Sequence, residues 1–304
     1  MKKPLLSHSV QFALSLLLAA AVVALAVYKG PELLQAFVRV RPGWVLAGAL
    51  FFAANYCFRA LRLTTLSPEP LRFWPQAVRT ACLHGMASFL FPFRAGDLTL
   101  PVLLKSANAT PLTVGTRMLI KARLLDVAAM GFWMAAAALV LPAAIPFYFR
   151  CVWLALALPM AGAPWILKGI GRFGSRFTTG WLGRMADAAA QAEFSRRLIL
   201  QSLAVWLTIG GFLFCATRAV GLELNLGEAW FLISIQLPLQ ILPVQGIAQA
   251  GNHEGGWVAG LALLGIPPGE GLNFALTSHA LILVNILALG PVALFARKKT
   301  APRG

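Results

Sequence analysis

The feature that most constrains this chain is a set of six long apolar segments, each holding at most one charged residue. Each has about 18 residues or more, enough for a helix to cross the roughly 30 Å hydrocarbon core of a bilayer. They are Val10–Tyr28, Trp44–Leu61, Leu124–Leu141, Phe147–Leu167, Leu198–Ala219 and Asn273–Ala296. Because lipid cannot satisfy exposed backbone polar groups, such segments are expected to be helical. The sequence therefore predicts an all-α polytopic membrane protein with about six full transmembrane helices, the first being a retained helix because it is longer than the apolar core of a signal peptide.

The strong positive charge of the chain has an explanation in its topology. Net charge is +16, with 26 lysines and arginines, which in a soluble protein would suggest a nucleic-acid partner. With both termini in the cytoplasm, most of these residues fall on the cytoplasmic side, including Arg59, Arg62 and those of a basic loop over residues 168–197. The sequence thus predicts a multi-pass protein of this orientation, and no nucleic-acid partner is needed.

Four shorter apolar stretches lie between the long ones and form two pairs, each joined by a polar segment. They are Ala81–Phe91, Leu98–Leu104, Trp230–Leu242 and Trp257–Leu264. Each length falls in or below the range expected of re-entrant or interfacial segments, and because the stretches come in pairs we expect two re-entrant helical hairpins. Residues 1–142 and 143–304 would then repeat one unit in opposite orientations, within a single membrane domain of residues 1–304. Inverted repeats with broken helices are common in transporters.

The tip of the first hairpin carries charge. Pro92 is expected to end the incoming helix, and Arg94, Gly96 and Asp97 follow it. Asp97 could simply cap the returning helix, but a cap does not explain Arg94 beside it. An arginine next to the open N–H groups of a helix start can bind phosphate, so Arg94, Gly96 and Asp97 are candidate substrate-binding residues.

The tip of the second hairpin partly repeats this pattern. Gly251 loosens the turn after Pro243, and Asn252, His253 and Glu254 begin the returning helix. Glu254 could act only on the helix dipole, and His253 could be a neutral, hydrogen-bonded histidine. A carboxylate at membrane depth is nevertheless a candidate binding group, so Gly251, Asn252, His253 and Glu254 join the predicted site.

Arg123 and Asp126 complete the candidate site. They lie three residues apart at the start of a long apolar segment, hence on one helical face, where we expect an ion pair with each other or with a hairpin tip. Direct contact with the ligand is the alternative. The four cysteines lie in apolar stretches without a C-x-x-C pair, and no nucleotide-binding, zinc or serine-nucleophile motif occurs. We therefore predict no metal, no cofactor and no enzymatic activity.

Together these motifs resemble the lysylphosphatidylglycerol synthase transmembrane region, also called the flippase-like family. The resemblance rests on Pro92-x-Arg94-x-Gly96-Asp97, on Arg123-x-x-Asp126, and on Pro243 with Gly251-x-x-Glu254 and Gly265-Ile266. The chain differs from the usual family pattern by having Asp97 in place of glutamate, and Leu100, Ala122 and His279 in place of arginine, glutamate and arginine. The resemblance implies a bacterial inner-membrane protein linked to lipid flipping. Since the chain ends at Gly304 without an aminoacyl-transferase domain, lysine transfer is not expected.

Three functional hypotheses follow. The first is a flippase that moves an anionic phospholipid or lipid-linked glycan between leaflets, with the headgroup at the hairpin tips and membrane lipids as its partners. The second is an integral-membrane lipid-modifying transferase with Asp97 or His253 as base. The third is a non-catalytic membrane partner of an enzyme of lipid or polysaccharide biosynthesis.

Overall fold

The computed structural model describes residues 20, 22–24, 26–28, 30–31, 38–141, 145–174, 193–239 and 246–296. Within these ranges every regular element is helical. The α-helices are α3 (Pro42–Leu66), α4 (Val78–Leu90), α5 (Thr99–Asn108), α6 (Leu112–Leu139), α7 (Phe147–Ala161), α8 (Ala163–Gly174), α10 (Arg196–Ala219), α11 (Leu226–Leu239), α12 (Asn252–Leu263) and α13 (Pro268–Phe295). Three short turns of other helical types are η1 (Phe73–Ala77), η2 (Pro92–Leu98) and η3 (Ile247–Gln249).

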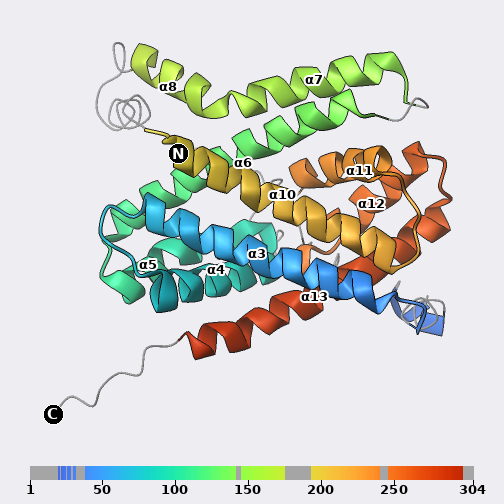
Figure 1. Cartoon of the computed structure of the whole chain (residues 1–304), viewed down its shortest axis with the longest axis horizontal. Helices are drawn as coiled ribbons and strands as arrows, with labels where there is room; N and C mark the ends of the chain where they lie inside the picture. Colours follow the sequence, from blue (N-terminus) through green and yellow to red (C-terminus); the bar gives the residue numbers. More distant parts are fainter. Residues whose placement is uncertain are drawn as a thin grey trace.

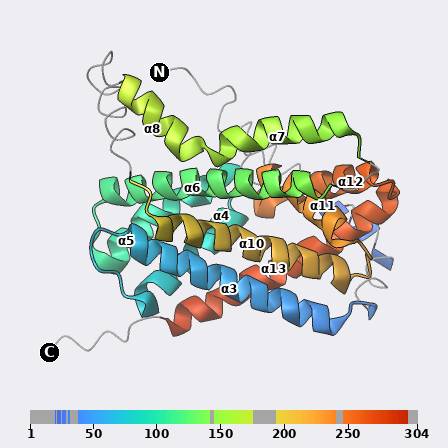
Figure 2. The same cartoon turned by 45° about the horizontal axis from the view of Figure 1, so that its top comes forward.

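Four of these helices, α3, α6, α10 and α13, are long and apolar enough to cross a membrane. A fifth span is added if α7 and α8, which meet at a bend of 59°, cross together; the bend is visible in Figure 2. The described residues therefore contain four or five candidate spans, which agrees with a polytopic membrane protein without establishing the predicted count of six. The predicted first span, Val10–Tyr28, lies mostly outside the described residues.

The predicted continuous segment Phe147–Leu167 is broken. Pro159 lies in the last turn of α7 and Gly162 ends that helix. Because proline has no N–H to donate, it weakens the helix just where the chain bends. Likewise, the first residues of the predicted basic loop 168–197 continue α8 as far as Gly174, and most of the rest lies outside the described residues.

Helices α3 and α10 form a long antiparallel pair (Figures 1 and 2). At one end the backbone N–H of Arg41 donates to the carbonyl of Ala219 at 2.9 Å. At the other end the side-chain amide of Gln201 donates to the hydroxyl of Thr65 at 3.1 Å. The start of each helix thus lies against the end of the other.

Two pairs of short helices accompany the long ones. Helices α4 and α5 contact each other across η2, and α11 and α12 contact each other across the segment that contains η3. These four helices have 10–14 residues, which is too short to cross a bilayer. The paired short helices that the sequence predicts are therefore present.

The two pairs start from opposite ends of the molecule. The amide of Gln76, just before α4, donates to the carbonyl of Ala107, near the end of α5, at 2.8 Å. The turn that contains Gln76 contacts α3, and α5 lies at the end of the molecule where α3 finishes (Figure 1). Helix α11 starts at the other end, where Gly227 lies against the carbonyl of Val140 just beyond α6. The turns η2 and η3 contact each other, so the two breaks meet inside the bundle.

Candidate functional site

The first break is built by a proline and a close backbone approach. Helix α4 ends at Leu90, and Pro92 opens η2. A Cβ added to Gly96 would lie 2.0 Å from the carbonyl oxygen of Ala87 in the last turn of α4. Only glycine allows η2 to lie this close to the helix before it.

Asp97 leaves this turn pointing toward other helices. Its Oδ1 accepts a hydrogen bond from the Ser88 hydroxyl at 2.9 Å, and it forms an ion pair with Arg123 of α6. The N-cap position of α5 is occupied by Leu98, so capping, the alternative for Asp97, does not account for its position. Its carboxylate instead connects the break to a spanning helix.

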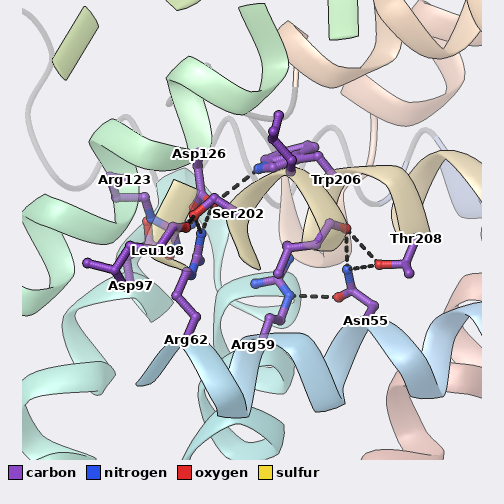
Figure 3. Close-up of polar contacts among 12 residues, drawn as sticks. Asn55, Arg59, Arg62, Asp97, Arg123, Asp126, Leu198, Ser202, Trp206 and Thr208 are labelled. Carbon is purple, nitrogen blue, oxygen red and sulfur yellow. Dashed lines mark hydrogen bonds and ion pairs between the residues drawn. The ribbon is translucent and has the colours of Figure 1, made fainter. Parts of the chain in front are cut away.

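Arg123 also pairs with Asp126 on its own helix, Nη1 to Oδ2 at 2.8 Å. It thus makes both ion pairs expected from the sequence. The other oxygen of Asp126 is 2.6 Å from Nη1 of Arg62 on α3 and accepts a hydrogen bond from the indole N–H of Trp206 on α10 at 3.1 Å. Arg62 and Asp126 are 6% and 5% exposed, so this is a buried network joining three helices and η2 (Figure 3). We call Asp97, Arg123, Asp126 and Arg62 the ion network.

Sequence reasoning placed Arg62 at the cytoplasmic surface and gave Trp206 no role. The nearby Arg59 was assigned in the same way; its Nε donates to Asn55 Oδ1 at 2.7 Å, and Asn55 in turn donates to the carbonyl of Val205 on α10 at 2.6 Å. The signal that could have found the two arginines is their spacing: they lie three apart, on one face of an otherwise uncharged helix.

The second break is centred on Gly251. This residue has φ +89° and precedes Asn252, where α12 begins. Glu254 Oε2 accepts the Gly251 backbone N–H at 2.9 Å, and the Asn252 amide donates to the Leu239 carbonyl at the end of α11 at 3.2 Å. The residues that the sequence placed at the start of the returning helix therefore lie there, while Pro243 is outside the described residues.

The other oxygen of Glu254 pairs with the imidazole of His279 on α13. His279 also contacts the carbonyl of Ala248 in η3 through Nε2, at 2.7 Å. His253 Nε2 lies 2.9 Å from the Ser278 hydroxyl. These four side chains of α12 and α13 are all buried. We call Glu254, His279, His253 and Ser278 the α12–α13 cluster.

The structure thus gathers the predicted residues into two groups. Asp97, Arg123 and Asp126 belong to the ion network, and His253 and Glu254 belong to the α12–α13 cluster. The groups approach each other where η2 contacts η3 and where Phe89, at the end of α4, packs edge-to-face on His279 with ring centroids 5.9 Å apart. The backbone of Arg94 lies in η2, but its side chain is outside what the structure describes, so its role in substrate binding stays a prediction. Among the described residues, no three histidine, cysteine or acidic side chains are grouped as metal ligands.

A family model described as the lysylphosphatidylglycerol synthase TM region matches residues 12–290 of the chain. The chain belongs to that family. No curated protein and no solved structure matches the chain.

The match to the lysylphosphatidylglycerol synthase TM region runs from before α3 to near the end of α13 and so includes both breaks. It identifies a multi-pass integral membrane protein of a lipid-related family. Two positions that differ from the usual family pattern, Leu100 and Ala122, are buried beside Arg123. The other two are Asp97, the partner of Arg123, and His279, the partner of Glu254. The differences from the lysylphosphatidylglycerol synthase TM region therefore lie in, or next to, the two groups described above.

Proposed function

We propose that this protein moves an anionic phospholipid or a lipid-linked glycan between the leaflets of a bacterial cytoplasmic membrane, without modifying it. The two short-helix pairs would be re-entrant hairpins of an inverted repeat. The substrate headgroup would pass where their tips meet, while the acyl chains remain in the bilayer. Both termini would be cytoplasmic, and neither metal nor cofactor would be required.

The observation that carries this proposal is the buried ion network attached to a helix break. Charged side chains are expensive at membrane depth and usually mark a substrate or ion pathway. Here Asp97, in the break, is linked through Arg123 to Asp126 and Arg62, and the break contacts η3, which belongs to the pair that starts from the opposite end. A rearrangement of one pair against the other would expose the region between them to each side in turn.

The order of the elements supports the repeat. Between α3 and α6 lies one short-helix pair, and between α10 and α13 lies the other. Each half of the described chain therefore places its short pair just before its last spanning helix. The opposite starting ends of the two pairs are what an inverted arrangement requires.

The test is lipid flipping in proteoliposomes that contain a fluorescent anionic phospholipid. We expect flipping above that of protein-free vesicles, and we expect Arg94→Ala and Glu254→Ala to abolish it. Arg41→Ala and Glu223→Ala are matched controls, because these two residues form an exposed ion pair away from both breaks. Activity unchanged in both Arg94→Ala and Glu254→Ala would refute the site. Mass spectrometry of the same lipids separates transport from transferase chemistry, since only the latter changes a lipid mass.

A further inference from the structure

A small cavity lies against the ion network, between α3, α4, α5 and α6. It has about 30 Å³ of room for water. Its polar lining is cationic or basic: the guanidinium groups of Arg59, Arg62 and Arg123, and the imidazole of His84. The rest of its lining is apolar and includes Leu100 and Ala122.

The charges around this cavity do not cancel. The carboxylates that pair with its arginines are Asp97 and Asp126, two negative charges against three positive ones. Among the described residues no carboxylate lies within ion-pair distance of Arg59, whose Nε bonds to the neutral Asn55. The wall of the cavity therefore carries an excess positive charge, which is costly inside a membrane unless an anion accompanies it.

The arginines that line the cavity also have N–H donors that are not fully used. A guanidinium has five N–H donors. Figure 3 shows the terminal nitrogens of Arg59 on the side of Arg62, away from Asn55. In the part of the chain that the structure describes, the buried Nε of Arg123 has no acceptor. The guanidinium groups of Arg59 and Arg62 line the same cavity and repel each other as like charges. An anion between them would reduce this repulsion.

The size of the cavity limits the ligand. A volume of about 30 Å³ holds on the order of two waters, which suits a compact oxyanion better than a complete lipid headgroup. Guanidinium groups bind phosphate oxygens through paired hydrogen bonds, and arginine does this better than lysine.

The geometry points to this cavity as a phosphate-binding site, with Arg59 as its main ligand and with Arg62 and Arg123 held in position by Asp126. Neither Arg59 nor Arg62 is among the site residues that the sequence predicts. The inference rests on the proposed function, because it names where the phosphate group of a translocated lipid binds near one end of its path. The phosphate could be that of a lipid or a free phosphate ion.

The experiment is native mass spectrometry of the purified full chain, released from nanodiscs that contain equal amounts of phosphatidylglycerol and phosphatidylcholine. We expect the wild-type protein to retain phosphatidylglycerol preferentially. Arg59→Gln should lower the retained fraction of phosphatidylglycerol at least tenfold. Arg59→Lys should have an intermediate effect, because lysine keeps the charge but not the paired N–H donors of the guanidinium group. Arg218→Gln is the matched control, since Arg218 packs on Phe214 at the opposite end of α10.

Inorganic phosphate, added before release, identifies the source of the ligand. Displacement of the lipid shows that the phosphate ion itself is bound, and retention of the lipid shows that only the lipid-borne group is bound. Wild-type levels of phosphatidylglycerol in both Arg59 variants would overturn the site. Flipping assays distinguish failure of this site from failure of the proposed function. A wild-type protein that binds lipid but does not flip it refutes only the transport function. Arg59 variants that bind and flip lipid normally refute only this site.

Discussion

Arg123 of α6 forms an ion pair with Asp97, which lies in the turn between two short helices. The same guanidinium pairs with Asp126 one helical turn further along α6. The position of the first helix break is therefore tied electrostatically to a spanning helix, and any movement of the break relative to α6 must lengthen or exchange this pair.

Asp126→Asn should strongly destabilise the protein. Asp126 is 5% exposed and pairs with two arginines, so its neutralisation leaves Arg62 and Arg123 with buried, poorly compensated charge. Loss of one partner of a buried pair typically costs about 3–5 kcal/mol. Thermal unfolding in detergent, followed by tryptophan fluorescence, measures the change. Glu223→Gln is the control. The side chains of Glu223 and its partner Arg41 are 67% and 51% exposed, so the expected loss in the free energy of unfolding is about 0–1 kcal/mol. Equal effects of the two substitutions would contradict the structural role of the ion network.

Gly96→Ala should disrupt the first break. The added Cβ would meet the backbone carbonyl of Ala87 at 2.0 Å, and backbone atoms in a helix cannot easily move aside. We expect a loss of about 3 kcal/mol in the free energy of unfolding, at the upper end of overpacking effects, together with loss of flipping. Gly255→Ala serves as the comparison, because Gly255 lies in α12 with no heavy atom within 4 Å of the added Cβ. There alanine should stabilise the helix by about 0.5–1 kcal/mol. A neutral Gly96→Ala would mean that η2 does not lie against α4 in this way.

Glu254 accepts the Gly251 N–H and pairs with His279, and two substitutions can separate these roles. Glu254→Gln keeps an oxygen that can accept the Gly251 N–H, whereas Glu254→Ala removes both that acceptor and the partner of His279. Loss of an N-terminal cap typically costs about 0.5–2 kcal/mol, so Glu254→Ala should unfold at a lower temperature than Glu254→Gln. Both should lose flipping if the negative charge is required. Flipping retained by Glu254→Gln alone would show that this residue only holds the turn.

The orientation of the chain can be tested by labelling. Lys105, in the last turn of α5, and Glu223, between α10 and α11, are both exposed, and α5 lies at the opposite end of the described structure from the end of α10 (Figure 1). In a variant lacking the four native cysteines, a membrane-impermeant maleimide added to intact cells should label Glu223→Cys but not Lys105→Cys. This outcome is expected because the end that carries most basic residues should face the cytoplasm. Labelling of Lys105→Cys in intact cells would reverse the proposed topology.

Local features of the sequence were sufficient for the membrane character and for the breaks. Apolar length identifies spanning helices because the bilayer thickness is fixed, and α3, α6, α10 and α13 fall where four of the predicted segments lie. The breaks at Pro92 and Gly251 are local as well, since they depend on a missing N–H and on a backbone conformation that favours glycine. The helical pairing of Arg123 with Asp126 follows from their spacing alone.

The sequence by itself thus determined that the chain crosses a membrane, where the two pairs of short helices are interrupted and which polar residues lie there, but not the bend between α7 and α8. Only the tertiary structure decided which of those residues meet. Arg62 and Asp126 are 64 residues apart and Trp206 is a further 80 along, and His279 reaches Glu254 from another helix. Helices that are apolar almost all round carry little periodic signal to show which face is turned inward. Their rotation, and with it the partner of every buried charge, is set by packing against the other helices.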